Sequence, residues 1–157
     1  MKVPYLSLNQ QWTDIRKEAL LLIDEVLTTG KYIEHEIVES LEVQLAQKLG
    51  VKHVVLVNSG TDALMLGLYS LGIKKNDEVI TVPNSFIASV AAIQHVGAVP
   101  KMVDVGADHL IDVTQIESAI TSKTRAIMPV HLEGKVCQMS KIMEIAKRHN
   151  LLIIEDV

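Results

Sequence analysis

A polar turn, Asn58-Ser59-Gly60-Thr61, joins an apolar run to a helical pattern. The first N–H groups of a helix lack partners within the helix and lie at the positive end of its dipole, so this turn could bind an anion such as phosphate. Gly60 would let the anion approach the backbone closely, and the hydroxyls of Ser59 and Thr61 add donors. Ser59 or Thr61 could instead serve only as the N-cap of the helix. The turn is neither a Walker motif nor a Gly-x-Gly-x-x-Gly motif, so the sequence leaves phosphate binding and simple capping both open.

Three further side chains that could do chemistry also follow apolar runs. Phe86, the only Phe of the chain, could stack on a planar cofactor or belong to the core. Asp156 could pair with a cationic ring nitrogen, bind a metal or cap a following helix. His131 could act as a ligand or a base, although a lone histidine is more often structural. The other histidines have no ligand spacing and Cys137 has no cysteine partner, so the sequence predicts no metal site.

The elements that must position these residues alternate along the chain. Helical periodicity predicts helices over residues 10–28, 36–49, 61–71, 85–96, 112–120 and 139–149, and short apolar runs predict strands over residues 53–57, 78–82, 101–105, 125–130 and 151–154. Alternating strands and helices with short turns indicate an α/β fold, a three-layer α/β/α arrangement around a mostly parallel sheet. Ligands bind at the carboxyl ends of the strands in such a sheet, where the polar turn, Phe86, His131 and Asp156 all lie.

The composition fits a globular protein and limits its partners. Of 157 residues, 48% are hydrophobic and 22% are charged, which excludes a disordered chain. Aromatic residues make up only 3%, which argues against a surface that stacks bases, and the net charge of −4 argues against binding to nucleic acid or anionic membranes. A single cysteine, no signal peptide and no apolar stretch near the ~20 residues of a membrane span indicate a cytoplasmic protein.

Three segments, residues 57–105, 121–134 and 146–157, resemble the nucleotide-sugar aminotransferases of the DegT/StrS family in order and spacing. The resemblance implies the fold of aspartate aminotransferase, a homodimer and pyridoxal 5′-phosphate as the cofactor. It also implies transfer of an amino group, usually from glutamate, to a keto sugar attached to a nucleotide, for sugar or surface-polysaccharide biosynthesis. The apolar face of the helix at 10–28 is the expected contact between subunits.

Five residues match the cofactor site of the family by position. Ser59, Gly60 and Thr61 would hold the cofactor phosphate. Phe86 would stack on the pyridine ring, and Asp156 would pair with the pyridinium nitrogen. A carboxylate in that place keeps the ring an electron sink, which is what the chemistry demands.

The lysine that forms the Schiff base in the family is expected some tens of residues after Asp156, so it lies beyond Val157 and no catalytic residue is predicted. We therefore expect residues 1–157 to form the amino-terminal segment and part of the large cofactor-binding domain, without the small carboxy-terminal domain. The chain also stops directly after the apolar run at 151–154, where domains seldom end. Such a chain is expected to be an inactive fragment.

Three departures from the family's pattern concern the substrate rather than the cofactor. Glu133 stands where tyrosine is usual, Cys137-Gln138 where an acidic pair is common, and His35 where glycine is common. Three alternatives to a transaminase stay open: a sugar 3-dehydratase of the same family, a non-enzymatic regulator on this fold, and a pyridoxal-phosphate lyase of the same fold type. The lysine position distinguishes transaminase from dehydratase, while a regulator would be expected to have lost Asp156 or the phosphate turn.

Overall fold

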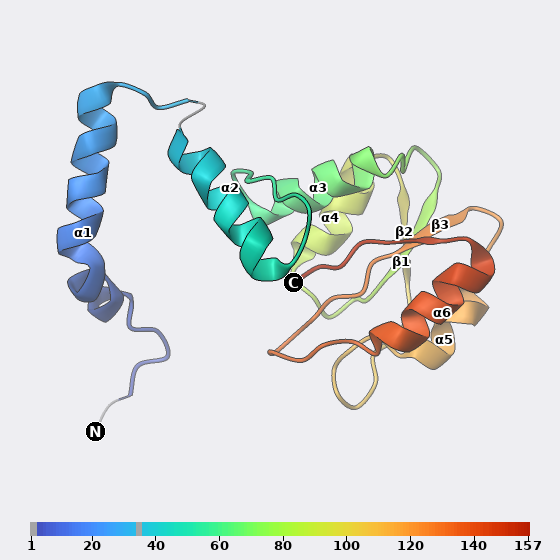
Figure 1. The fold of residues 1–157 in the computed structure, drawn as a ribbon. Coiled ribbons are helices and arrows are strands. Elements are labelled where there is room, and N and C mark those ends of the chain that lie inside the picture. The colour runs from blue at the N-terminus through green and yellow to red at the C-terminus, as the bar shows by residue number, and fades with distance from the viewer. Residues whose placement is uncertain (1–2, 34–35) are drawn as a thin grey trace. The chain divides into compact units, whose positions relative to one another are not determined.

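The computed structural model describes residues 3–33 and 36–157 (Figure 1). Its internal contacts divide the chain into two compact units, one that ends at Leu56 and one that runs from Val57 to Val157. Each unit is described by itself below. His35 lies outside the described residues.

The amino-terminal unit contains two helices, α1 (Leu8–Thr29) and α2 (Glu36–Leu49), among its described residues. Both helices confirm the predictions from periodicity. Helix α1 ends where Gly30 adopts a left-handed conformation with φ of 68° and donates its N–H to the carbonyl of Val26 at 3.1 Å. Glycine adopts this conformation at no steric cost, which is why it ends the helix. No side chain of α1 is buried, although the helix is rich in leucine and isoleucine.

Residues 57–157, all of which the structure describes, hold four helices and four strands. In chain order they are α3 (Gly60–Ser70), β1 (Glu78–Thr81), α4 (Ile87–His95), β2 (Val99–Met102), α5 (Val113–Ala119), β3 (Thr124–Ile127), α6 (Met139–His149) and β4 (Leu152–Ile153). The strands form one sheet in the order β2-β1-β3-β4, and every neighbouring pair is parallel. The prediction of an α/β fold with a parallel sheet is therefore confirmed.

Helices cover both faces of this sheet (Figure 1). Successive side chains of a strand point to opposite faces, so Val79 and Ile80 of β1 enter different cores. Val79 packs with Met128 and with buried residues of α3 and α4, whereas Ile80 packs with Ile127 and with buried residues of α5 and α6. This arrangement gives the predicted three layers, with the sheet between two pairs of helices.

The prediction of a strand at residues 53–57 is wrong. The backbone there forms no β pairing, and Val55 is 76% exposed. The N–H of Leu56 donates to the carboxylate of Glu42 at 2.8 Å, where a strand would donate to a neighbouring strand. A continuous apolar run predicts that a segment favours burial, but a strand also requires a partner strand, which composition alone does not supply.

The strand predicted at 101–105 begins two residues earlier and ends three residues earlier, at Val99–Met102. Pro100 is the second residue of β2, although proline lacks an N–H and interrupts interior strands. Here β2 pairs only with β1 and forms an edge of the sheet, with Pro100 opposite Val79. Proline is tolerated at an edge, since one side of its backbone needs no hydrogen bond to a neighbouring strand.

Candidate active site

A cavity of about 330 Å³ lies at the carboxyl edge of the sheet, within the unit that begins at Val57. The first residues of α3 and α4 and the segment after β4 line it. Four of the predicted cofactor residues take part in this lining, namely Gly60, Thr61, Phe86 and Asp156. The fifth, Ser59, directly precedes α3 as its N-cap. The fold thus brings together residues that are almost 100 positions apart in the sequence.

The start of α3 combines a capped end with free donors. The Ser59 hydroxyl oxygen accepts the N–H of Asp62 at 3.1 Å, and its proton is donated to the Asp62 carboxylate at 2.9 Å. Ser59 is therefore the N-cap that the simpler interpretation predicted. The N–H groups of Gly60 and Thr61 donate to no acceptor within residues 3–33 and 36–157. They remain available for an anion in the cavity.

Gly60 presents an open face to that anion. A methyl group built on its Cα would meet no atom within 4 Å. The space beside this backbone would thus be filled by any larger side chain, so glycine keeps the two free N–H groups accessible. This property is what a phosphate cradle at a helix start needs.

Asp156, which also lines the cavity, is held in place by its backbone. Its N–H donates to the carbonyl of Pro129 at 3.0 Å, and its own carbonyl accepts the N–H of His131 at 2.8 Å. These two bonds continue the parallel pairing of β3 and β4 past the strand ends, with Val130 opposite Asp156. The side chain accepts a hydrogen bond from the hydroxyl of Ser89 through Oδ2 at 2.5 Å.

Ser89 lines the cavity and was not predicted from the sequence. It lies in α4, four residues after Ser85, and only 1% of it is exposed. The available signal was a serine on the buried face of a mostly apolar helix, because a buried hydroxyl is almost always hydrogen-bonded.

Phe86 is the N-cap residue of α4, and 75% of it is exposed. This exposure contradicts the interpretation of Phe86 as a core residue. An exposed aromatic ring that lines a cavity is suited to stacking on a planar ligand.

His131 has the structural role that a lone histidine most often has. Its Nδ1 accepts the N–H of Cys137 at 3.3 Å, so Nε2 carries the proton and donates it to the Glu155 carboxylate at 2.9 Å. Burial raises the pKa of the Cys137 thiol, which donates to the carbonyl of Val130 at 3.2 Å. His131 and Cys137 therefore fix the loop after β3 rather than face the cavity as reactive groups.

The described residues contain no group of three or more histidine, cysteine, aspartate or glutamate side chains that could hold a metal ion. Within the same part of the chain, no helix combines the length and the apolar composition required to cross a membrane.

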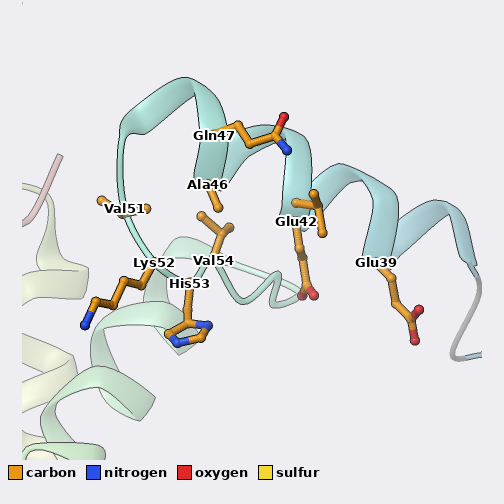
Figure 2. Close-up of a pocket in the computed structure, with 9 residues that line it drawn as sticks. Glu39, Glu42, Ala46, Gln47, Val51, Lys52, His53 and Val54 are labelled. Carbon is orange, nitrogen blue, oxygen red and sulfur yellow. The ribbon is translucent and has the colours of Figure 1, made fainter.

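A second cavity, of about 370 Å³, belongs to the amino-terminal unit. It lies between α2 and residues 51–54, with Glu42 and Ala46 on the helix and His53 and Val54 on the segment that follows (Figure 2). None of the predicted cofactor residues lines it. The candidate active site is therefore the cavity at the carboxyl edge of the sheet.

This active-site cavity offers complementary groups for one kind of ligand. Two free N–H groups at the positive end of α3 favour an anion, and the Asp156 carboxylate favours a cation or a hydrogen-bond donor. The exposed ring of Phe86 favours a flat molecule. A planar, phosphorylated heterocycle with a protonated ring nitrogen combines all three features.

The chain matches known proteins along nearly its whole length. Residues 13–157 match the model of the DegT/DnrJ/EryC1/StrS aminotransferase family. The chain is 41% identical over 156 residues to the dTDP-3-amino-3,4,6-trideoxy-alpha-D-glucose transaminase of Streptomyces venezuelae. This match covers 99% of this chain and 41% of that protein. It is also 39% identical over 157 residues to a pleiotropic regulatory protein of Geobacillus stearothermophilus. That match covers 99% of this chain and 42% of that protein.

The fold is similar to that of solved aminotransferases. The structure of NtdA from Bacillus subtilis with the bound cofactor PMP superposes with a TM-score of 0.95 at 41% identity, over 99% of this chain and 36% of that chain. The chain spans about two fifths of the length of the relatives that it matches.

Proposed function

This chain belongs to the DegT/DnrJ/EryC1/StrS aminotransferase family, and we propose that it is part of an enzyme that uses pyridoxal phosphate to transfer an amino group to a sugar. The amino donor in this proposal is glutamate and the acceptor is a keto sugar linked to a nucleotide. A relative named as a dTDP-amino-sugar transaminase supports the substrate class. The proposal concerns the intact protein that contains these residues, because the chain spans about two fifths of such relatives.

One observation carries the proposal: two free backbone donors and a carboxylate line the same cavity. The N–H groups of Gly60 and Thr61 would hold the cofactor phosphate, with the Ser59 cap fixing the helix start. Phe86 would lie against one face of the ring. Asp156 would accept a hydrogen bond from the ring nitrogen. The volume of about 330 Å³ is within the range of roughly 300–1,000 Å³ that is usual for small-molecule sites.

When bound, pyridoxal phosphate supplies an electron sink for the carbon that loses or gains the amino group. The residues of this chain contribute binding and electrostatics to that chemistry. The Asp156 carboxylate would accept a hydrogen bond from the ring nitrogen and so favour the protonated ring, and the start of α3 would hold the phosphate.

No lysine lines the active-site cavity among the described residues, so we assign the amine that binds the cofactor covalently to no residue of this chain. In our proposal it lies in sequence that the relatives have and this chain does not contain. A sugar dehydratase or a non-enzymatic regulator would use the same cavity, and the similarity to a pleiotropic regulatory protein keeps the second candidate in the test.

We also propose that residues 57–157 are part of the large cofactor-binding domain and that the intact protein is a homodimer. Helix α1 supports the proposal of a homodimer, because its apolar side chains Ile15, Leu22 and Ile23 are each about half exposed. Burial of such a helix in a subunit contact would remove apolar surface from water. The buried thiol of Cys137, the chain's only cysteine, fits the reducing cytoplasm as the location.

The test is an Asp156→Ala substitution in the intact protein. A hydrogen bond to a charged group contributes about 1.5–3 kcal/mol, so we expect about 10- to 150-fold weaker binding of pyridoxal phosphate and loss of 2-oxoglutarate formation from glutamate. Asp24→Ala, an exposed position in α1, is the matched control and should bind and turn over like the parent. Binding of pyridoxal phosphate without any amino transfer would favour the regulator or the dehydratase, and a parent without cofactor affinity would refute the proposal.

A further inference from the structure

We propose that Ser89, aided by Ser85, is a positioning residue that sets the orientation of the Asp156 carboxylate toward the cofactor ring. This inference rests on the proposed function and adds to it two residues of α4 and its preceding turn. Neither residue was predicted from the sequence, and neither is needed to hold the phosphate.

The contact between Ser89 and Asp156 joins positions 67 residues apart. The Ser89 hydroxyl lies 2.5 Å from Oδ2 of Asp156 and 3.3 Å from the carbonyl oxygen of Phe86. A hydroxyl has one proton to donate, and a carboxylate is the stronger acceptor. The shorter distance and the charge both direct that proton to Asp156.

A second hydroxyl continues the chain of hydrogen bonds. The Ser85 oxygen lies 3.0 Å from the Ser89 oxygen and 3.4 Å from the carbonyl of Phe86, so its nearer acceptor is Ser89. Ser85 therefore donates to Ser89, which donates to Asp156. Each bond in such a chain polarises the next one, which strengthens the last bond to the carboxylate.

The geometry leaves one carboxylate oxygen for the cofactor. The backbone of Asp156 is fixed by its bonds to Pro129 and His131, so the remaining freedom is rotation of the side chain. The bond from Ser89 occupies Oδ2, whereas Oδ1 has no hydrogen-bond partner within residues 3–33 and 36–157. Since Asp156 lines the cavity, fixing Oδ2 prevents the side chain from rotating and keeps Oδ1 available to the ring nitrogen.

Burial of Ser89 protects its hydrogen bond to Asp156 from water. Ser89 is 1% exposed and packs within the α3–α4 side of the sheet, so bulk water does not compete for its proton. Pre-orientation of this kind costs nothing at the moment of binding, because the fold has already ordered the groups.

The experiment compares four variants of the intact protein by their affinity for pyridoxal phosphate and by the pH titration of the bound cofactor's absorption. Ser89→Ala removes the donor, and we expect about 5- to 20-fold weaker binding and a shifted titration. Ser85→Ala should shift both in the same direction by a smaller factor. Ser89→Thr keeps a hydroxyl and should restore the parent's titration. Ser118→Ala removes an exposed hydroxyl that bonds only to the Gln115 carbonyl, and it should match the parent.

A double variant separates positioning from general stability. If Ser89 acts through Asp156, Ser89→Ala should weaken cofactor binding no further in an Asp156→Ala background, whereas a purely structural role would weaken it in both backgrounds. A parent that binds pyridoxal phosphate, together with a Ser89→Ala variant of equal affinity and titration, would overturn the positioning role alone. A parent that binds none would overturn the proposed function itself.

Discussion

Substitutions at Ser59 separate its role in folding from its place beside the anion site. The hydroxyl caps α3 through a 3.1 Å bond from the N–H of Asp62, and loss of such a cap costs about 1 kcal/mol. The reciprocal bond to the Asp62 carboxylate is exposed and adds little. For a chain of 157 residues, 1 kcal/mol corresponds to a fall in Tm of about 2–4 °C. We therefore expect Ser59→Ala to lower Tm by about that amount.

Two matched variants at the same position complete the test. Asparagine and aspartate cap helices about as well as serine, so Ser59→Asn and Ser59→Asp should keep Tm near the parent's. Ser59→Asp also puts a negative charge beside the free N–H groups of α3, and repulsion of the cofactor phosphate should weaken pyridoxal phosphate binding by at least about tenfold. Tm is followed by circular dichroism and affinity by cofactor absorption. If Ser59→Asp binds the cofactor as tightly as Ser59→Asn, the phosphate does not bind at this turn.

Three further outcomes test the packing and the electrostatics of the second unit. Leu68→Ala removes a fully buried side chain of α3, so urea unfolding should show a loss of about 2–5 kcal/mol, against less than about 0.5 kcal/mol for the half-exposed Leu66 changed to alanine. Burial raises the pKa of the Cys137 thiol, so iodoacetamide at pH 8 should alkylate the native protein far more slowly than the urea-unfolded chain, as mass spectrometry would report. The hydrogen bond from His149 lowers the pKa of Glu117 below its usual 4.5. This carboxylate therefore stabilises the fold above that pH and loses its effect as the pH falls through the lowered value. Glu117→Gln should remove that part of the acid sensitivity when unfolding is measured between pH 3 and 6.

The helices could be predicted from the sequence because their signals are local. Apolar residues three and four positions apart define one helix face, and a glycine such as Gly30 marks the end of the helix. The prediction of a strand at 53–57 was wrong because the pairing of strands is not a local property of the sequence. Its residues are more apolar than those of β3, yet β3 lies between two partner strands while the N–H of Leu56 bonds to a side chain.

The residues of the candidate site likewise differ in whether a local signal in the sequence indicates them. Ser59, Gly60 and Asp156 could be predicted as candidates because each follows an apolar run, and the carboxyl ends of parallel strands and the starts of the adjoining helices share one edge of the sheet. Ser89 could not be predicted in this way. Its proposed role depends on the hydrogen bond to Asp156, and no periodicity within α4 indicates a partner 67 residues away.

The order of the strands explains why one cavity collects these groups. β1 and β3 are adjacent in the centre of the sheet, so the helix that follows β1 starts beside the segment that follows β4, the neighbour of β3. Helix α3 packs against α4 on the same face, which brings its free N–H groups to that edge as well. The donors at the start of α3 are thus held by apolar packing, while the Asp156 carboxylate is held by parallel pairing and by Ser89. Because different forces fix the donors of α3 and the Asp156 carboxylate, a change at Ser59 and a change at Ser89 should weaken cofactor binding independently, and their effects on the binding free energy should add.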